Sequence, residues 1–155
     1  MAGISISKLG IHIKVSDIAR SRAFYEALGF QKVFEYGPGT SVPENYSGTT
    51  YGVGDTALLE IADGHVGIED KSVFQQPITG PKTSLMVNVD SLIPVLLAAR
   101  SNNVPHSGKT TWYHWNTLET VIRDPDGLVL VFIAPYSAEE QANVERLTGI
   151  PVNRL

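Results

Sequence analysis

Two stretches of the chain share an order of apolar and polar positions that predicts one strand, one helix and three further strands. In the first, GIHIKV at residues 10–15 alternates between polar and apolar positions, as expected of a strand with one buried face. The segment SDIARSRAFYEALGF follows, with apolar residues at helical spacing between a capping Ser16 or Asp17 and a terminating Gly29. Short strands are then predicted near residues 32–35, 49–53 and 57–62.

The second stretch repeats this order with almost no repetition of residues. SLMVN at residues 84–88 alternates as a strand, and Asp90 is predicted to cap the helix SLIPVLLAARSNN. In RDPDGLVLVF, Asp124 and Gly127 favour a tight turn that leads directly into an apolar strand. The strands predicted in this half cover residues 109–116, 118–123 and 128–133.

The pattern therefore divides a single domain into unit 1, at about residues 8–62, and unit 2, at about 83–135. The segment between them, at about 63–82, is polar, contains prolines and shows no sustained period, so it is predicted to be a linker. A helix at about 137–148 should follow unit 2, because Ser137 and Glu140 form a capping-box pattern.

Composition narrows the possible classes of protein. A net charge of -4 over 155 residues argues against nucleic acid as the partner, because phosphate binding needs a concentrated basic surface. Cysteine is absent, which excludes disulfides, thiolate catalysis and sulfur-ligated zinc. We expect a cytoplasmic protein without membrane contact, since the sequence starts without a signal-peptide pattern and lacks a long apolar run.

The repeated element order, together with V-S-D, S-x-x-F-Y and L-G-F in unit 1 and D-P-D-G in unit 2, resembles the vicinal oxygen chelate superfamily. That superfamily includes glyoxalase I, extradiol dioxygenases and the fosfomycin and bleomycin resistance proteins. The resemblance implies an α+β fold in which two βαβββ units form curled mixed sheets around a central cavity, followed here by a C-terminal helix. It also implies a homodimer.

The resemblance further implies four metal-ligand positions, on the first and last strand of each unit. In this chain they fall on Gly10, Glu60, Ser84 and Val131, of which Glu60 alone carries a ligand side chain. We therefore predict no metal cofactor. The alternative is a shifted divalent metal site formed by His12 and Glu60, to which His114 could contribute.

The same alternation predicts which residues line the cavity, and the lining indicates the kind of ligand. Its inner faces should be mostly apolar with a few polar groups, which is typical of a small-molecule site. In glyoxalase I-like members a basic residue at the position of Lys14 faces an anionic conjugate, and the aromatic strand near 109–116 offers a wall for a flat ligand. The predicted ligand-binding residues are His12, Lys14, Glu60, Met86, Asn88, Trp112, His114 and Val131.

These observations favour a protein that binds a small, partly aromatic or anionic molecule without chemistry. The alternative is a glyoxalase-like lyase or isomerase, or a dioxygenase, that uses the shifted metal. A metal-free enzyme would use Glu60 as its catalytic residue, a general base with His12 or Lys14 stabilising the oxyanion. Whether any reaction is catalysed stays open at this point.

Overall fold

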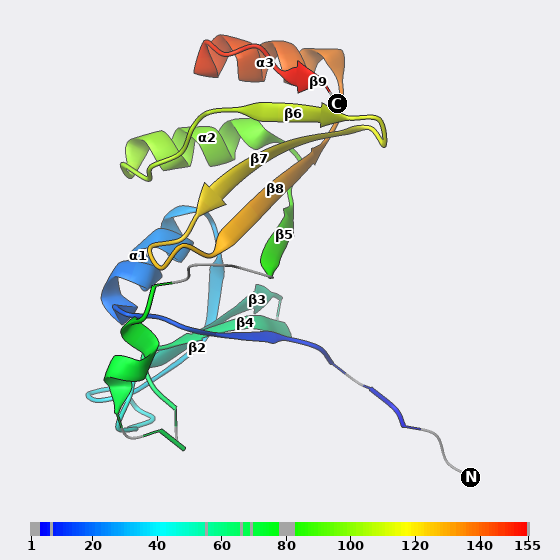
Figure 1. The fold of residues 1–155 in the computed structure, drawn as a ribbon. Helices are drawn as coiled ribbons and strands as arrows, with labels where there is room; N and C mark the ends of the chain where they lie inside the picture. Colours follow the sequence, from blue (N-terminus) through cyan, green and yellow to red (C-terminus); the bar gives the residue numbers. More distant parts are fainter. Residues whose placement is uncertain are drawn as a thin grey trace. The chain divides into compact units, whose positions relative to one another are not determined.

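A computed structural model describes residues 4–6, 8–54, 56–65, 67–68, 70–77 and 83–154 (Figure 1). The chain forms two compact units that divide between Gln76 and Pro77, inside the segment predicted to link them. Each unit contains the predicted strand, helix and three strands, so the repeated βαβββ order is confirmed.

Unit 1 is a mixed four-stranded sheet covered on one face by a helix. The strands have the order β1-β4-β3-β2, with β1 parallel to β4 and the other neighbours antiparallel. Its elements are β1 (Ile11–Lys14), α1 (Ile18–Ala27), β2 (Gln31–Tyr36), β3 (Gly48–Val53), β4 (Thr56–Ala62) and the short 3₁₀ helix η1 (Lys71–Gln75).

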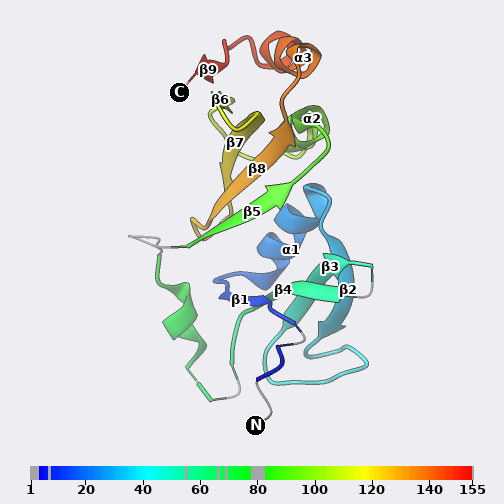
Figure 2. The ribbon, with the colours of Figure 1, turned by 90° about the vertical axis from the view of Figure 1, so that its right-hand side faces the viewer.

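Unit 2 repeats this plan with two additions at the C-terminal end. The sheet has the order β5-β8-β7-β6-β9, in which β5 is parallel to β8 and β9 is parallel to β6 (Figure 2). Its elements are β5 (Ser84–Asn88), α2 (Leu92–Ser101), β6 (Thr110–Tyr113), β7 (Thr117–Arg123), β8 (Val129–Pro135), α3 (Ala138–Thr148) and β9 (Asn153–Arg154).

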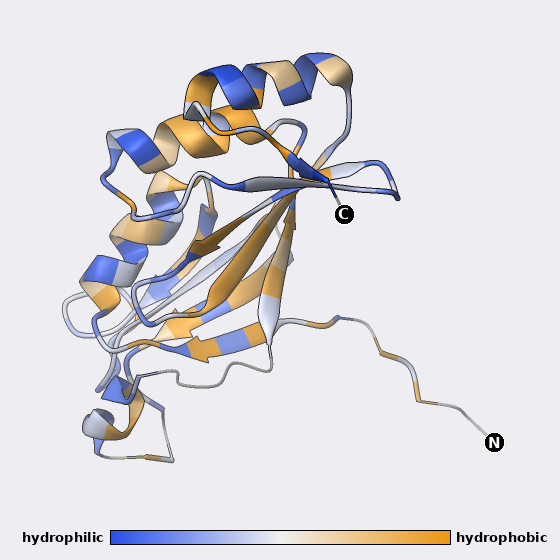
Figure 3. Ribbon diagram, turned by 45° about the horizontal axis from the view of Figure 1, so that its top comes forward, coloured by the Kyte–Doolittle hydropathy of each residue, from blue (hydrophilic) through white to orange (hydrophobic). Residues whose placement is uncertain are grey.

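Strand alternation decides which face of each sheet is covered. In unit 1, Val15, Ile61 and Tyr51 are almost fully buried on the face toward α1, where Tyr25 fills the space between helix and sheet. In unit 2, the buried residues of β8 are Leu130, Phe132 and Ala134, and α2 covers them with Leu92, Val95, Leu96 and Ala99. In Figure 3 the orange colour of β8 shows its apolar sequence. The opposite face of each sheet is more exposed, so any binding surface is expected there.

The ends of α1 are capped by the residues expected from the sequence, whereas the start of α2 is capped by a different residue from the one predicted. Asp17 caps α1, and Gly29 follows its end with a positive φ of 91°. The predicted cap of α2 was wrong: Ser91, not Asp90, accepts a hydrogen bond from the backbone N–H of Ile93. Asp90 lies one residue too early because the chain turns into the helix at Ser91.

The C-terminal helix also differs from its prediction in one respect. Ser137 accepts a hydrogen bond from the N–H of Glu140, as in a capping box. The Glu140 carboxylate instead accepts hydrogen bonds from the Ser91 hydroxyl at 2.8 Å and the Leu92 N–H at 2.7 Å. It therefore caps α2 and attaches α3 to that helix.

The strand predicted at residues 109–116 is shorter than expected. β6 ends at Tyr113, and residues 114–116 form a turn in which Asn116 has a left-handed φ of 65°. His114 and Trp115 therefore do not alternate as strand residues. The edge strand β9 was not predicted, since two residues carry no periodic signal.

No helix within the described residues has both the length and the apolar character that crossing a membrane requires.

Candidate functional site

The open face of unit 1 presents a row of side chains that the strand register aligns. His12 on β1, Glu60 on β4 and Thr50 on β3 are direct neighbours, and Phe34 on β2 completes the row. The residues that flank His12 and Glu60, Ile13 and Ile61, point the other way and are buried under α1. Because the period of a strand is two, the core side of the sheet fixes this polar row on the open side.

Glu60 is held in place by Tyr36, which lies one step along the sheet. The Tyr36 hydroxyl donates a hydrogen bond of 2.5 Å to Glu60 Oε1. Burial, with help from this bond, raises the pKa of Tyr36, so the phenol remains a donor at neutral pH. The ring reaches Glu60 by crossing Gly48, where a Cβ atom would overlap it.

His12 and Lys14 extend the cluster along β1. Lys14 Nζ lies 2.8 Å from His12 Nε2, and the same His12 atom lies 3.4 Å from Glu60 Oε1. Burial lowers the pKa of His12; Glu60 raises it, while Lys14 and His65 lower it further. The ring is therefore neutral at pH 7, and Nε2 accepts a hydrogen bond from Lys14.

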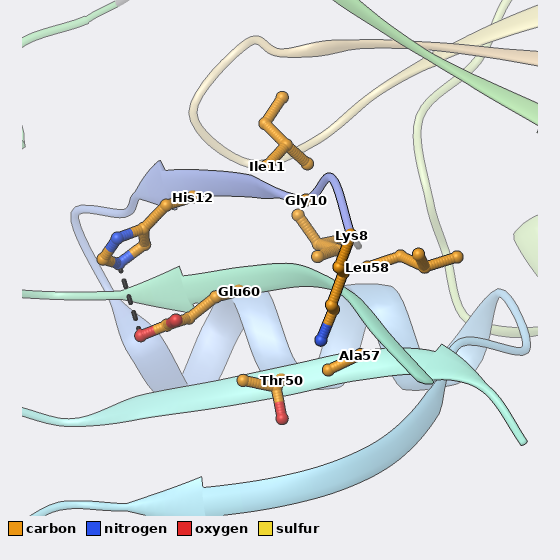
Figure 4. A pocket seen from close by; sticks show the side chains of 9 residues that line it. Lys8, Gly10, Ile11, His12, Thr50, Ala57, Leu58 and Glu60 are labelled. Atoms are coloured by element: carbon orange, nitrogen blue, oxygen red, sulfur yellow. Dashed lines mark ion pairs between the residues drawn. The ribbon is translucent and has the colours of Figure 1, made fainter. Parts of the chain in front are cut away.

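Beside this cluster is an open pocket of about 220 Å³ in unit 1 (Figure 4). Its floor is formed by small and apolar residues, and its polar groups come from the ends of side chains around it. In Figure 4 the Glu60 carboxylate and the His12 ring point toward each other. The Lys8 side chain reaches over the sheet toward Ala57, and Thr50 lies on the neighbouring strand with its hydroxyl pointing away from Glu60. The lining residues are Lys8, Gly10, Ile11, His12, Thr50, Ala57, Leu58, Leu59 and Glu60.

Aromatic rings form a wall on the same face. The Phe34 and Tyr36 rings are tilted at a centroid distance of 6.1 Å, and Tyr46 contacts Tyr36 edge-on at 5.6 Å. Phe34 remains 45% exposed, which leaves its ring available to a flat ligand. The face therefore combines apolar and aromatic surface with a few polar groups, as small-molecule sites do.

The predicted site residues of unit 2 lie on both faces of its sheet. Met86 and Val131 are register partners on the open face, where Met86 is 74% exposed. Asn88 lines a second pocket, of about 410 Å³, at the ends of β5 and β8. Trp112 pairs with the fully buried Leu118 and packs against Tyr136 on the opposite face. His114 lies in the turn after β6.

Sequence reasoning missed the contributions of Tyr36, Phe34, Thr50 and Lys8 to the site in unit 1. The signal for Tyr36 is Gly48, since a glycine in a strand interior often marks a place where another group approaches closely. Gly48 can be connected with Tyr36 only once the register of β2 with β3 is known, because that register places the two residues directly opposite each other.

The metal centre implied by the resemblance does not fit these residues. Gly10 has no side chain, and a Cβ atom there would lie 3.2 Å from the Leu58 carbonyl oxygen. Ser84 and Val131 carry no imidazole or carboxylate, and the one retained ligand, Glu60, is bonded to Tyr36. Within the described part of the chain, no cluster of three or more His, Asp or Glu side chains is close enough to hold an ion. A divalent ion needs about three protein ligands.

Known structures share the fold at low sequence identity. A glyoxylase/bleomycin resistance protein/dioxygenase domain from Frankia sp. EAN1pec is 17% identical, with a TM-score of 0.58 over 88% of this chain and 99% of that one. Fosfomycin resistance protein FosX from Listeria monocytogenes, determined with Mn(II) and sulfate, is 14% identical; its TM-score is 0.57 over 89% and 99%.

A glyoxalase I mutant from Zea mays is 16% identical, with a TM-score of 0.59 over 83% of this chain and 45% of that one. A search of curated proteins found no match. A family model, described as Glyoxalase/Bleomycin resistance protein/Dioxygenase superfamily, matches residues 9–132. With its two βαβββ units and a match over most of its length, this chain belongs to the glyoxalase/bleomycin resistance protein/dioxygenase superfamily.

Proposed function

We propose that this protein binds a small, partly aromatic or anionic molecule on the open face of unit 1 without a metal ion. The observation that supports this most strongly is the state of Glu60. It occupies the acidic ligand position of the superfamily, yet its carboxylate accepts a hydrogen bond from Tyr36 and lies beside His12. The other ligand positions, Gly10, Ser84 and Val131, cannot coordinate an ion through their side chains.

The surface around Glu60 supplies the interactions that such a ligand needs. Phe34 and Leu58 are exposed apolar side chains at 45% and 44%, so an aromatic ring placed on them would lose contact with water. The ammonium groups of Lys8, which lines the pocket, and of Lys14, which lies beside His12, are both nearby positive charges. We assign the carboxylate or similar anion to Lys14.

The contacts predicted in unit 2 at Met86, Asn88, His114 and Val131 remain separate predictions, as does the homodimer. Trp112 lies on the helix-covered face of its sheet, beside Leu118, and is not part of the open face.

A metal-free enzyme is the second candidate. His12 Nε2 lies 3.4 Å from Glu60 Oε1, a geometry in which the carboxylate could take a proton from a ligand and His12 could stabilise the product. The bond from Tyr36 occupies one of the carboxylate oxygens, which favours binding over general-base chemistry. Turnover of a bound ligand would distinguish this candidate from the first.

Calorimetric titration with 1-naphthoate tests the proposal, with neutral 1-naphthalenemethanol as the matched compound. We expect 1-naphthoate to bind equally well before and after treatment with a chelator. Lys14→Met should weaken its binding about tenfold, because about 1.4 kcal/mol of charge interaction is lost. Lys109→Met, at an exposed lysine of unit 2, is the control and should have no effect. Binding that disappears with the chelator, or that is unchanged in Lys14→Met, would contradict the proposal.

A further inference from the structure

The turn after β6 carries a platform of aromatic rings. The Tyr113 and Trp115 rings are stacked with their centroids 4.6 Å apart and their planes inclined by 8°, and the His114 ring contacts Trp115 at 4.7 Å. Trp115 is still 56% exposed, although tryptophan is mostly buried in folded proteins. Its indole N–H donates a hydrogen bond of 3.2 Å to Glu119 Oε1, which holds the exposed ring in one orientation. An oriented, exposed tryptophan is typical of a recognition surface.

Glu119 places a carboxylate beside this platform. Strand pairing puts it between Thr111 of β6 and Ile133 of β8, on the open face of the sheet. Trp115 Nε1 and the Thr117 hydroxyl, the latter at 2.8 Å, both donate to Oε1, so Oε2 accepts no hydrogen bond from the described residues. Glu119 also forms no ion pair with any lysine, arginine or histidine that the structure describes. The carboxylate is therefore oriented, but its charge is not neutralised.

The other tryptophan of unit 2 has a cation on its ring, which Trp115 lacks. On the helix-covered face of the sheet, the Arg154 guanidinium lies over the Trp112 ring, 5.3 Å from its centre. A cation in this position is attracted by the electrons of the ring face. Among the described residues no cation lies over Trp115, and Arg123, on the open face of β7, bonds to a backbone carbonyl oxygen in its own turn. The Trp115 ring and the neighbouring carboxylate can therefore both receive a positive charge from outside the chain.

The pocket of about 410 Å³ in unit 2 adjoins this carboxylate. Thr117 and Ile133 line the pocket, and the first bonds to Glu119 while the second lies directly opposite it on β8. The lining includes no lysine, arginine or histidine; its one charged residue is Asp90, which forms no ion pair with a described residue. The pocket therefore offers apolar surface and negative charge next to the aromatic platform.

We propose that this surface of unit 2 binds an organic ammonium ion, a protonated amine attached to an aromatic or aliphatic group. The ammonium donates a charge-assisted hydrogen bond to Glu119 Oε2 and lies against the Trp115 ring, while the apolar group enters the pocket. Glu119 and Asp90 repel an anion, so the site selects the charge opposite to the one proposed for unit 1. It uses neither Lys14 nor Glu60, and it does not depend on the function proposed above.

The indole N–H signals in ¹H–¹⁵N correlation NMR spectra test this proposal, because the chain has only two tryptophans. Phenethylamine, which is protonated at pH 7, is titrated into the full chain, with uncharged 2-phenylethanol as the matched compound. We expect phenethylamine to shift the Trp115 signal to saturation and to leave the signal of the buried Trp112 N–H in place. Trp115→Phe assigns the two signals. 2-Phenylethanol should bind at least about tenfold more weakly, since it lacks the charge. Equal affinities for the two compounds, or an unshifted Trp115 signal, would overturn the proposal.

Glu119→Gln separates the negative charge from the hydrogen bonds of the platform. Its side-chain oxygen can still accept the bonds from Trp115 and Thr117, so the rings keep their place. We expect this variant to bind phenethylamine about tenfold more weakly and 1-naphthoate as the native protein does, so this site and the one proposed in unit 1 can fail separately. Glu44→Gln, at an exposed loop residue of unit 1, is the control and should change neither affinity. Native affinity for phenethylamine in Glu119→Gln would contradict the assignment.

Discussion

Replacing Gly48 with valine is expected to destabilise unit 1 and to weaken binding of 1-naphthoate. The Tyr36 ring occupies the space above Gly48, and any Cβ atom there overlaps it. Overpacking of this kind costs about 1–3 kcal/mol of unfolding free energy. The displaced ring also loses its bond to Glu60. Urea denaturation measures the first effect and calorimetry the second.

A double-mutant cycle with Tyr36→Ala shows whether the tyrosine is the cause. Glycine in a strand interior is unfavourable by about 0.5–1 kcal/mol relative to alanine, and valine is a good strand residue. In the Tyr36→Ala background, Gly48→Val should therefore be neutral or stabilising. If valine costs as much there as in the native sequence, the overlap with Tyr36 is not what requires glycine at position 48.

Replacing Asp124 with alanine is expected to cost about 2–4 kcal/mol, since two backbone donors lose a largely buried acceptor. Asp124 is 4% exposed, and its Oδ1 accepts hydrogen bonds from the N–H groups of Asp126 at 2.9 Å and Leu128 at 2.8 Å. Gly127 has a positive φ of 93° in the same turn. The turn joins β7 to β8, so its loss affects the whole sheet of unit 2.

Asp124→Asn is the matched variant for this prediction. Its side-chain oxygen can still accept the bonds from Asp126 and Leu128, so we expect a cost below about 1 kcal/mol. Equal midpoints of urea denaturation for the alanine and asparagine variants would show that these hydrogen bonds do not stabilise the turn.

The fold was predictable wherever a local pattern has a single physical interpretation. The alternation in GIHIKV and SLMVN identified β1 and β5. In β1 the apolar face packs under α1, where Ile13 is buried, and in β5 Leu85 and Val87 are the less exposed positions. Gly29 and Gly127 marked turns whose positive φ values of 91° and 93° favour glycine. These features depend on neighbours in sequence, which the sequence displays directly.

The features that were missed depend on partners far apart in sequence. Glu140 was expected to complete its own capping box, but it bonds to Ser91 and Leu92 at the start of α2. These bonds form only when α2 and α3 are packed together, so the sequence around Glu140 does not show that its carboxylate caps α2 and not α3. The end of β6 at Tyr113 has a different, local cause: residues 114–116 form a tight turn in which the N–H of Asn116 donates a hydrogen bond to the Tyr113 carbonyl oxygen, and no glycine or proline marks that turn.

The candidate site also has a part that local sequence predicts and a part that depends on pairing between strands. The period of two placed His12, Lys14 and Glu60 on one face, and the structure brings them within hydrogen-bond or ion-pair distance. Tyr36 belongs to another strand, and its bond to Glu60 depends on the register of β2 with β3 and on the absence of a side chain at Gly48. Alternation alone carries no information about register between strands.

Metal content is the most direct test of the claim that Glu60 belongs to an internal hydrogen-bond network and not to a metal centre. The protein is purified without chelator, incubated with Mn²⁺, Fe²⁺, Co²⁺, Ni²⁺ and Zn²⁺, desalted, and measured by inductively coupled plasma mass spectrometry. We predict below about 0.1 equivalent of any of these ions per chain, because the donor set is too small for tight binding. One equivalent of a bound ion that is lost in Glu60→Gln would contradict the account.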